Sequence, residues 1–112
     1  MNTDIKHEDN ITIVAVNGSV DALTAPDLAR AIVDEIAEGH VYLVVDLTGV
    51  EFMSSAGLRT LLGAVKETRS QGGDLRIAST NPGIDKLLKM SGFHNVAKVF
   101  TSNVDAVASF GP

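Results

Sequence analysis

The segment Val50-Glu51-Phe52-Met53-Ser54-Ser55-Ala56-Gly57-Leu58-Arg59 holds the change from strand to helix around which this chain is arranged. Before it, the run from Tyr42 to Leu47 is apolar without alternation, which is typical of a strand covered on both faces. We expect a short turn after this run and a second apolar step from Val50 to Met53. A helix follows at once, so two serine hydroxyls are predicted at the start of a helix and at the end of a buried strand.

The helix after the serine pair is predicted to run to about Gln71, where Gly72-Gly73 closes it. Its apolar residues recur at helical spacing and its charged residues occupy the other face. The inward positions are Leu58, Leu61, Leu62 and Val65, and the outward positions are Arg59, Lys66, Glu67 and Arg69.

Two strands are expected before this unit. Ile5 to Glu8 has the pattern of a short edge strand, and Ile11 to Val16 is rich in β-branched residues. The dipeptides Asp9-Asn10 and Asn17-Gly18 are turn signals, so the two strands are predicted to form a hairpin. We expect Gly18 to Asp21 to be a loop.

A first helix is predicted from Thr24, which suits an N-cap, followed by Pro26 and by Asp27 at the positive end of the helix dipole. Gly39 is expected to end it. Its apolar stripe comprises Leu28, Ile32 and Ile36, with Ala25, Ala29 and Val33 beside them.

The last third contains shorter elements. A strand from Leu75 to Ala78 precedes a helix that Asn81-Pro82 opens and Ser91-Gly92 ends. A last strand is expected from Val96 to Phe100. The inward residues of the helix are predicted to be Ile84, Leu87, Leu88 and Met90, and a short terminal helix, capped by Ser102 or Asn103, carries Val104, Val107 and Ala108.

This order, β-β-α-β-α-β-α-β-α, predicts a single α/β domain over residues 1–112. We expect a mixed, mostly parallel sheet of about four to five strands with about four helices.

Composition excludes several classes of function. The net charge of −5 argues against proteins that bind nucleic acid or anionic membranes through a basic face. The chain has no cysteine, and its histidines, His7, His40 and His94, match no zinc spacing, so we expect no metal site and no cofactor. There is no apolar run of about 20 residues and no signal peptide pattern, so we expect a cytoplasmic protein without membrane insertion.

The serine pair is the best candidate for chemistry. A helix N-terminus offers unpaired N–H groups and partial positive charge, which favour a phosphoryl group. The alternative is that the hydroxyls only cap the helix, a role that we assign to Ser54 in preference to Ser55. A hydrolase elbow, Gly-x-Ser-x-Gly, fits Ser55 and Gly57 but fails at Met53, and His94 is the only histidine downstream.

Other candidate sites are weaker. No Walker sequence is present, and Gly72-Gly73 is more typical of a helix terminus than of a phosphate loop. Asp21 in a loop and Asp46 at a strand end are expected at the rim formed by the carboxyl ends of the strands, where Asp21 would approach Ser55. The exposed face with Arg59, Lys66 and Arg69 is expected to be a solvated face, but it is also the surface nearest the serines and would form part of any interface there.

Nearly the whole chain resembles a STAS domain, in particular a bacterial anti-sigma factor antagonist. The resemblance rests on four segments in order: Gly18-Ser19-Val20-Asp21, Val44-Val45-Asp46-Leu47, Phe52-Met53-Ser54-Ser55-Ala56-Gly57-Leu58, and Leu87-Leu88-Lys89-Met90-Ser91-Gly92-Phe93.

The resemblance implies specific roles for the site residues. Ser55 matches the phosphate acceptor, with Asp21 and Gly57 near it. Many members have Asp before the acceptor where this chain has Ser54, which leaves Ser54 as a second candidate acceptor. A partner interface of Ser54, Ala56, Leu58 and Arg59 is implied.

The function that the resemblance implies is partner switching by a protein that is not an enzyme. The unmodified domain binds an anti-sigma factor that is also a serine-protein kinase, and a sigma factor is released. Phosphorylation ends the complex and a PP2C-type phosphatase resets it, with no direct contact to nucleic acid. The alternative is a STAS subunit of a transporter or sensory complex in which no sigma factor takes part.

Overall fold

The computed structural model describes residues 1–79 and 81–111. Over these residues the predicted order of strands and helices is confirmed, with one short 3₁₀ helix added. The elements are β1 (Asn2–Glu8), β2 (Ile11–Val20), α1 (Ala25–Ala37), β3 (Tyr42–Met53), α2 (Ser55–Ser70), β4 (Asp74–Ala78), α3 (Pro82–Met90), η1 (Phe93–Asn95), β5 (Val99–Phe100) and α4 (Asn103–Ala108).

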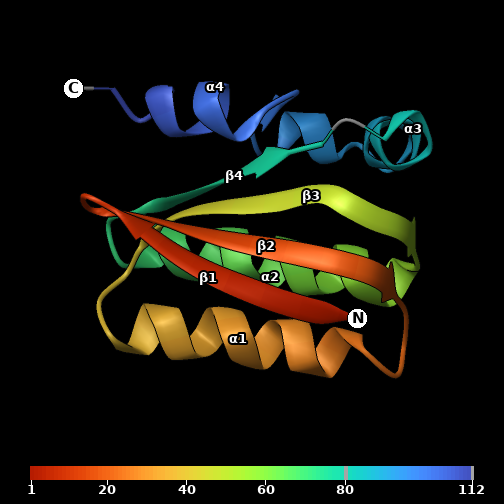
Figure 1. The fold of residues 1–112 in the computed structure, drawn as a ribbon, viewed down its shortest axis with the longest axis horizontal. Coiled ribbons are helices and arrows are strands. Elements are labelled where there is room, and N and C mark those ends of the chain that lie inside the picture. The colour runs from red at the N-terminus through yellow and green to blue at the C-terminus, as the bar shows by residue number, and fades with distance from the viewer. Residues whose placement is uncertain (80, 112) are drawn as a thin grey trace.

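The five strands form one sheet in the order β1-β2-β3-β4-β5. The hairpin partners β1 and β2 are antiparallel, and every other neighbouring pair is parallel. The mixed, mostly parallel sheet predicted from the alternation of strands and helices is therefore confirmed. Because the parallel strands point the same way, their carboxyl ends meet at one rim, on the right of Figure 1.

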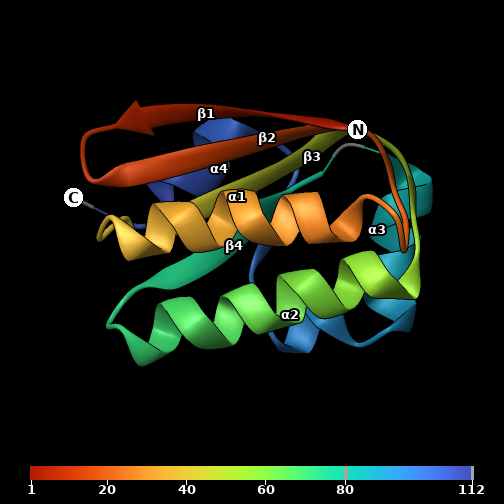
Figure 2. The same cartoon turned by 90° about the horizontal axis from the view of Figure 1, so that it is seen from below.

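Helices cover both faces of the sheet. Figure 1 shows α1 below the strands and α4 above them, and Figure 2, seen from below, shows α1 and α2 side by side. In β3 the side chains of Leu43, Val45 and Leu47 join the core on the α1–α2 side, while Val44 points to the α4 side. The apolar run from Tyr42 to Leu47 is thus the doubly covered strand that its lack of alternation predicts.

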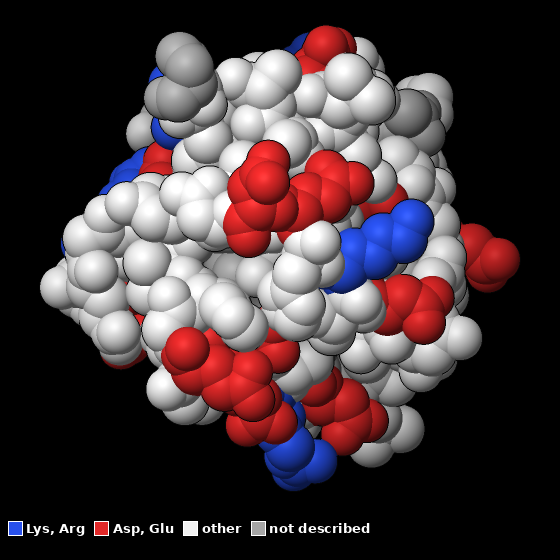
Figure 3. All heavy atoms as spheres, turned by 60° about the vertical axis from the view of Figure 1, so that its left-hand side comes forward, with Lys and Arg blue, Asp and Glu red and all other residues white. Residues whose placement is uncertain are grey.

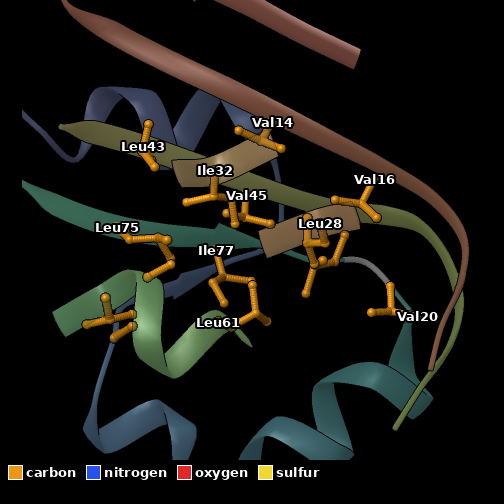
Figure 4. Packing of buried hydrophobic residues seen from close by; sticks show 14 of the residues in the cluster. Val14, Val16, Val20, Leu28, Ile32, Leu43, Val45, Leu61, Leu75 and Ile77 are labelled. Atoms are coloured by element: carbon orange, nitrogen blue, oxygen red, sulfur yellow. The ribbon is translucent and has the colours of Figure 1, made fainter. Parts of the chain in front are cut away.

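The larger core lies between the sheet and the two long helices. Figure 4 shows Val14, Val16 and Val45 from the strands facing Leu28, Ile32 and Leu61 from the helices. All six are almost completely buried. Burial of this kind contributes roughly 1.5–3 kcal/mol for each large aliphatic side chain, which fixes α2 and its first turn against the sheet.

The first helix departs from its prediction at one stripe position and at its N-cap. Val33 is exposed rather than inward. Thr24 occupies the N-cap position but makes no capping hydrogen bond, so its predicted capping role is wrong. Its Oγ1 instead donates to Ser19 O at 3.0 Å and accepts from Asp21 N at 2.9 Å.

The first three strands are longer than predicted, and β1 begins at Asn2 rather than at Ile5. Residues 18–20 belong to β2 rather than to the expected loop, and β3 is continuous where a turn was expected after Leu47. Irregular pairing between β2 and β3 replaces that turn: Ala15 pairs with Asp46, but Asn17 pairs with Gly49 and Ser19 with Phe52. Extra residues in β3 are accommodated as bulges, which bend a strand without ending it.

The last third differs most from its prediction. Residues 96–98, which follow η1, form a turn rather than strand, and β5 comprises only Val99–Phe100. Met90, predicted inward, is 76% exposed, and in α4 Val104 is 78% exposed and Ala108 is also exposed. The inward residue of α4 is Ala106, and Ser102 supplies its cap by accepting from Asp105 N at 3.1 Å.

No helix among residues 1–79 and 81–111 has the length and apolar character needed to cross a membrane.

Candidate functional site

The carboxyl ends of β2 and β3 form the floor of the site. Val20, the last residue of β2, pairs with Met53, the last residue of β3. The backbone then joins the two strand ends once more, because Ser54 N donates to Val20 O at 2.8 Å. Asp21 leaves β2 directly beside the point where the serine pair leaves β3, so the pairing places Asp21 and the serine pair at the same rim.

Gly57 allows the first turn of α2 to approach this floor closely. A methyl group at position 57 would lie 2.9 Å from Val20 Cγ1 and 2.8 Å from Met53 Cγ. Both separations are shorter than carbon atoms tolerate, and Val20 is a stiff β-branched side chain. Packing therefore requires glycine at the third position of α2. This explains why glycine follows the serine pair and Ala56 in the sequence.

Ser54 occupies the N-cap position of α2 but does not cap it. Its side chain makes no capping hydrogen bond, so the capping role predicted for it is wrong. The Oγ atom is buried and has no hydrogen-bond partner within residues 1–79 and 81–111. A buried hydroxyl without a partner costs about 1–3 kcal/mol, so this position carries a polar group at the expense of stability.

Ser55 is the first residue of α2, and its side chain is exposed. The first helical hydrogen bond runs from Leu58 N to Ser54 O at 3.2 Å. The N–H groups of residues 55–57 precede that bond, so the helix provides no acceptor for them. An exposed hydroxyl thus stands beside backbone donors and the positive end of a helix dipole.

Asp21 organises the turn between β2 and α1. Its Oδ1 accepts hydrogen bonds from Thr24 N at 3.0 Å and from Leu23 N at 2.9 Å. The hydrogen bond from the Thr24 N–H, supported by the one from Leu23, holds the pKa of the Asp21 carboxyl below its usual value, although desolvation opposes this. Asp21 is therefore a charged group held in place at the same rim as the serines.

Asp46 does not belong to this rim. It lies in the middle of β3 rather than at the predicted strand end. One carboxylate oxygen accepts from Thr48 N at 2.9 Å, and the other accepts from Asn103 Nδ2 at 2.8 Å, so Asp46 links β3 to α4. The prediction that both aspartates lie at the carboxyl ends of the strands is wrong for Asp46.

The residues predicted as a partner interface are not equally accessible. Arg59 is exposed and Ala56 is partly exposed, but Leu58 packs against the core and the hydroxyl of Ser54 is buried. Sequence reasoning missed two apolar side chains beside the site: Phe52, 54% exposed at the end of β3, and Leu23, 88% exposed after Asp21. The available signal was an apolar residue close to each strand end, Phe52 within the last two residues of β3 and Leu23 three residues after β2.

The hydrolase alternative requires a histidine hydrogen-bonded to Ser55, and no such hydrogen bond is present among the described residues. His94 lies in η1, and its Nε2 is 3.3 Å from Asp85 Oδ1 of α3. Met53, at the position where the elbow pattern requires glycine, is buried against Gly57. The arrangement at Ser55 is therefore not that of a nucleophile activated by histidine.

The sequence is similar to known proteins over almost the whole chain. It is 29% identical over 106 residues to the anti-sigma F factor antagonist of Paenibacillus polymyxa, with 93% of this chain and 90% of that protein covered. It is 33% identical over 98 residues to the anti-sigma-B factor antagonist of Listeria monocytogenes, with 86% and 85% covered.

A solved structure has the same fold. The fold superposes on the crystal structure of an anti-sigma factor antagonist from Mycobacterium paratuberculosis with a TM-score of 0.87 and 27% identity, covering 96% of this chain and 92% of that one. The family model of the STAS domain matches residues 2–106. With its strand order, its helix-end serine and these relatives, the chain belongs to the STAS domain family.

Proposed function

We propose that this protein is an anti-sigma factor antagonist that is switched by phosphorylation of Ser55. Relatives that bear this name cover most of the chain. The observation that carries the proposal is the position of Ser55, exposed at the start of α2 beside backbone N–H groups without helical acceptors. The buried hydroxyl of Ser54 is a poorer acceptor, because a kinase must reach the oxygen that it modifies.

The helix end favours the modified state of the domain itself. A phosphoryl group on Ser55 would add about −1.5 to −2 charges beside the positive end of the α2 dipole. Arg59 follows four residues later on α2 and is exposed, so its guanidinium is on the same helix face as the phosphate. Modification is therefore compatible with the fold, and its main effect would be on a partner.

The partner is proposed to be an anti-sigma factor with serine-protein kinase activity. Leu23 and Phe52 offer exposed apolar surface beside Ser55, and Ala56 and Arg59 continue that surface along α2. A dianion introduced into such a contact must be desolvated, and it meets the Asp21 carboxylate at the same rim. Several kcal/mol of lost affinity would release the kinase and leave it free to bind its sigma factor.

This proposal makes the chain a substrate and a ligand, not an enzyme. The kinase supplies ATP and the transferred phosphoryl group, and a PP2C-type phosphatase removes that group. A sigma factor acts in the cytoplasm, which is where this cycle would operate.

The first experiment identifies the partner and the acceptor together. Proteins bound to the untagged chain from its own host would be identified by mass spectrometry, and the kinase found would be incubated with the chain and ATP. We expect one phosphate per chain, lost in Ser55→Ala. The control is Ser70→Ala, an exposed serine at the other end of α2. Undiminished phosphate in Ser55→Ala would overturn the assignment, and loss in Ser54→Ala alone would move it to Ser54.

The second experiment tests the switch. Ser55→Asp should bind the unmodified chain's kinase partner at least tenfold more weakly, while Ser55→Ala keeps wild-type affinity. If the bound proteins are instead components of a transporter or sensory complex, and no kinase is among them, the protein is a STAS subunit of that assembly and the sigma-factor function is wrong.

A further inference from the structure

We propose that His7, Glu35 and His40 form a binding site for one transition-metal dication of the Zn²⁺ class. These residues come from β1, from the last turn of α1 and from the loop that follows α1. One ligand atom from each, an imidazole nitrogen from each histidine and a carboxylate oxygen, lies within 4.8 Å of the others. Because the histidines are far apart in the sequence, no sequence motif indicates this cluster.

The three side chains already converge on one point. His7 Nε2 lies 2.7 Å from Glu35 Oε1, and His40 Nδ1 lies 3.1 Å from the same oxygen. The two imidazole rings are 4.6 Å apart between centroids. Ligands at about 2.0 Å from a tetrahedral ion are about 3.3 Å from one another, so small side-chain movements convert this cluster into a coordination shell.

The backbone holds two of the ligands in place before any ion binds. Gly39, at φ +90°, turns the chain at the end of α1. Gly39 N donates to Ile36 O at 2.9 Å and His40 N donates to Glu35 O at 3.0 Å, which together make a Schellman motif. The residues at the two ends of that motif are Glu35 and His40, so their relative position is fixed by main-chain hydrogen bonds.

The third ligand is fixed by strand register. His7 of β1 pairs with Thr12 of β2, and Ile5 pairs with Val14, whose side chain packs in the core beneath α1. Residues two apart in a strand share a face, so His7 points toward the same helix as Ile5. An ion held here would tie the edge strand to the end of α1.

Charge at this end of the molecule favours a cation. Asp34, Glu35 and Glu38 lie at the carboxyl end of α1, where the dipole is negative, and the last turn contains no basic residue. The Glu35 side chain is only 12% exposed, and Glu38 Oε2 is 3.8 Å from His40 Nδ1, within reach as a fourth ligand. Figure 3 shows that acidic side chains cover more of this side of the molecule than basic ones.

The donor set selects the class of metal. Two imidazoles with one or two carboxylates suit Zn²⁺ and its neighbours among the transition metals, whereas Ca²⁺ and Mg²⁺ prefer oxygen ligands alone. The cluster lies at the amino end of β2 and the carboxyl end of α1, the opposite rim from Ser55 (Figure 1). The site is therefore independent of the switch and would act on stability.

Calorimetric titration of the untagged full chain with Zn²⁺ tests the proposal, with Ca²⁺ titrated in parallel. We expect one Zn²⁺ per chain, an increase in melting temperature on binding, and no response to Ca²⁺. His7→Asn and Glu35→Gln should each weaken Zn²⁺ binding at least tenfold and abolish the increase in melting temperature. His94→Asn is the matched control, since it removes a histidine that also contacts a carboxylate but lies in η1.

Co²⁺ provides a second measurement that does not depend on stability. Bound Co²⁺ should show the intense visible absorption of a four-coordinate ion in wild type and in His94→Asn, but not in His7→Asn. Circular dichroism of the metal-free variants checks that each is folded. Absence of saturable Zn²⁺ binding, or equal binding by folded His7→Asn, would overturn the proposal.

Discussion

The two rims of the sheet use polar groups in opposite ways. At the amino end, His7, Glu35 and His40 satisfy one another, and main-chain bonds complete the end of α1. At the carboxyl end, the Ser54 hydroxyl has no partner in the described part of the chain, the first N–H groups of α2 have no helical acceptor, and Phe52 is exposed. Unsatisfied groups over a closely packed floor are what a surface needs if a partner or a phosphate is to complete it.

The largest expected effect is on partner binding, which should depend on apolar side chains at the carboxyl rim. Phe52→Ala and Leu23→Ala should each weaken binding of the proposed kinase partner by about 2 kcal/mol or more, because large apolar side chains dominate affinity where they lie at the centre of an interface. Calorimetry on the purified pair measures the change. Met90→Ala and Val104→Ala are the controls, since these side chains are exposed to a similar degree but belong to α3 and α4. Equal losses for all four would place the interface elsewhere.

The first turn of α2 packs on the floor formed by the ends of β2 and β3. We expect this turn to tolerate an added methyl group less well than the rest of α2. Gly57→Ala should destabilise the fold by about 1–3 kcal/mol, because the added methyl overlaps Val20 and Met53. Gly63→Ala, in the same helix, has open space around the new methyl and should stabilise by about 0.5–1 kcal/mol. Urea unfolding of both variants measures the difference. The same sign for both changes would mean that close packing is not the reason for glycine at position 57.

Ser54 offers a smaller test of the same contrast. Replacing a capping serine by alanine usually costs about 1 kcal/mol. Ser54→Ala should instead leave the free energy of unfolding unchanged or raise it by up to about 1 kcal/mol, because the hydroxyl is buried without a partner. Ser102→Ala is the matched change at a serine that does cap, accepting from Asp105 N at 3.1 Å, and it should destabilise.

If Ser54→Ala destabilises as much as Ser102→Ala, the hydroxyl has a partner in solution and the contrast between the rims is weaker than proposed. Phosphate incorporation by the proposed kinase should persist in Ser54→Ala, since the proposed acceptor is Ser55. Both measurements use one purified variant.

Sequence patterns could predict the structural features that depend on local chemistry and on the period of the apolar residues. The doubly covered strand, the inner face of α2, the cap at Asn81 and the overall strand order are of this kind. The strand ends were less predictable, since pairing with β3 carries β2 through Gly18, a residue that usually marks a turn. Similarly, neighbouring strands decide that only Val99–Phe100 pairs with β4.

Side-chain partners were the least predictable part of both rims. Serine at a helix start predicts a cap, but the rotamer that buries the Ser54 hydroxyl depends on packing between α2 and the strand ends. The meeting of His7 with His40 depends on strand register and on a glycine turn far away in sequence. Such contacts are properties of the tertiary structure, so a single sequence shows only the residues that take part.

The smallest effect is expected at Asp21, through pH. The hydrogen bond from Thr24 N–H lowers the pKa of this carboxyl, so the folded state favours its charged form. Its contribution to stability is therefore present above the ordinary carboxyl pKa of about 4 and is lost as pH falls through the lowered value. Asp21→Asn keeps an oxygen acceptor for Thr24 and Leu23 but cannot titrate. Between about pH 5 and pH 3, wild type should lose more stability than the variant in urea unfolding, whereas parallel losses would show that the Asp21 charge is not held by the turn.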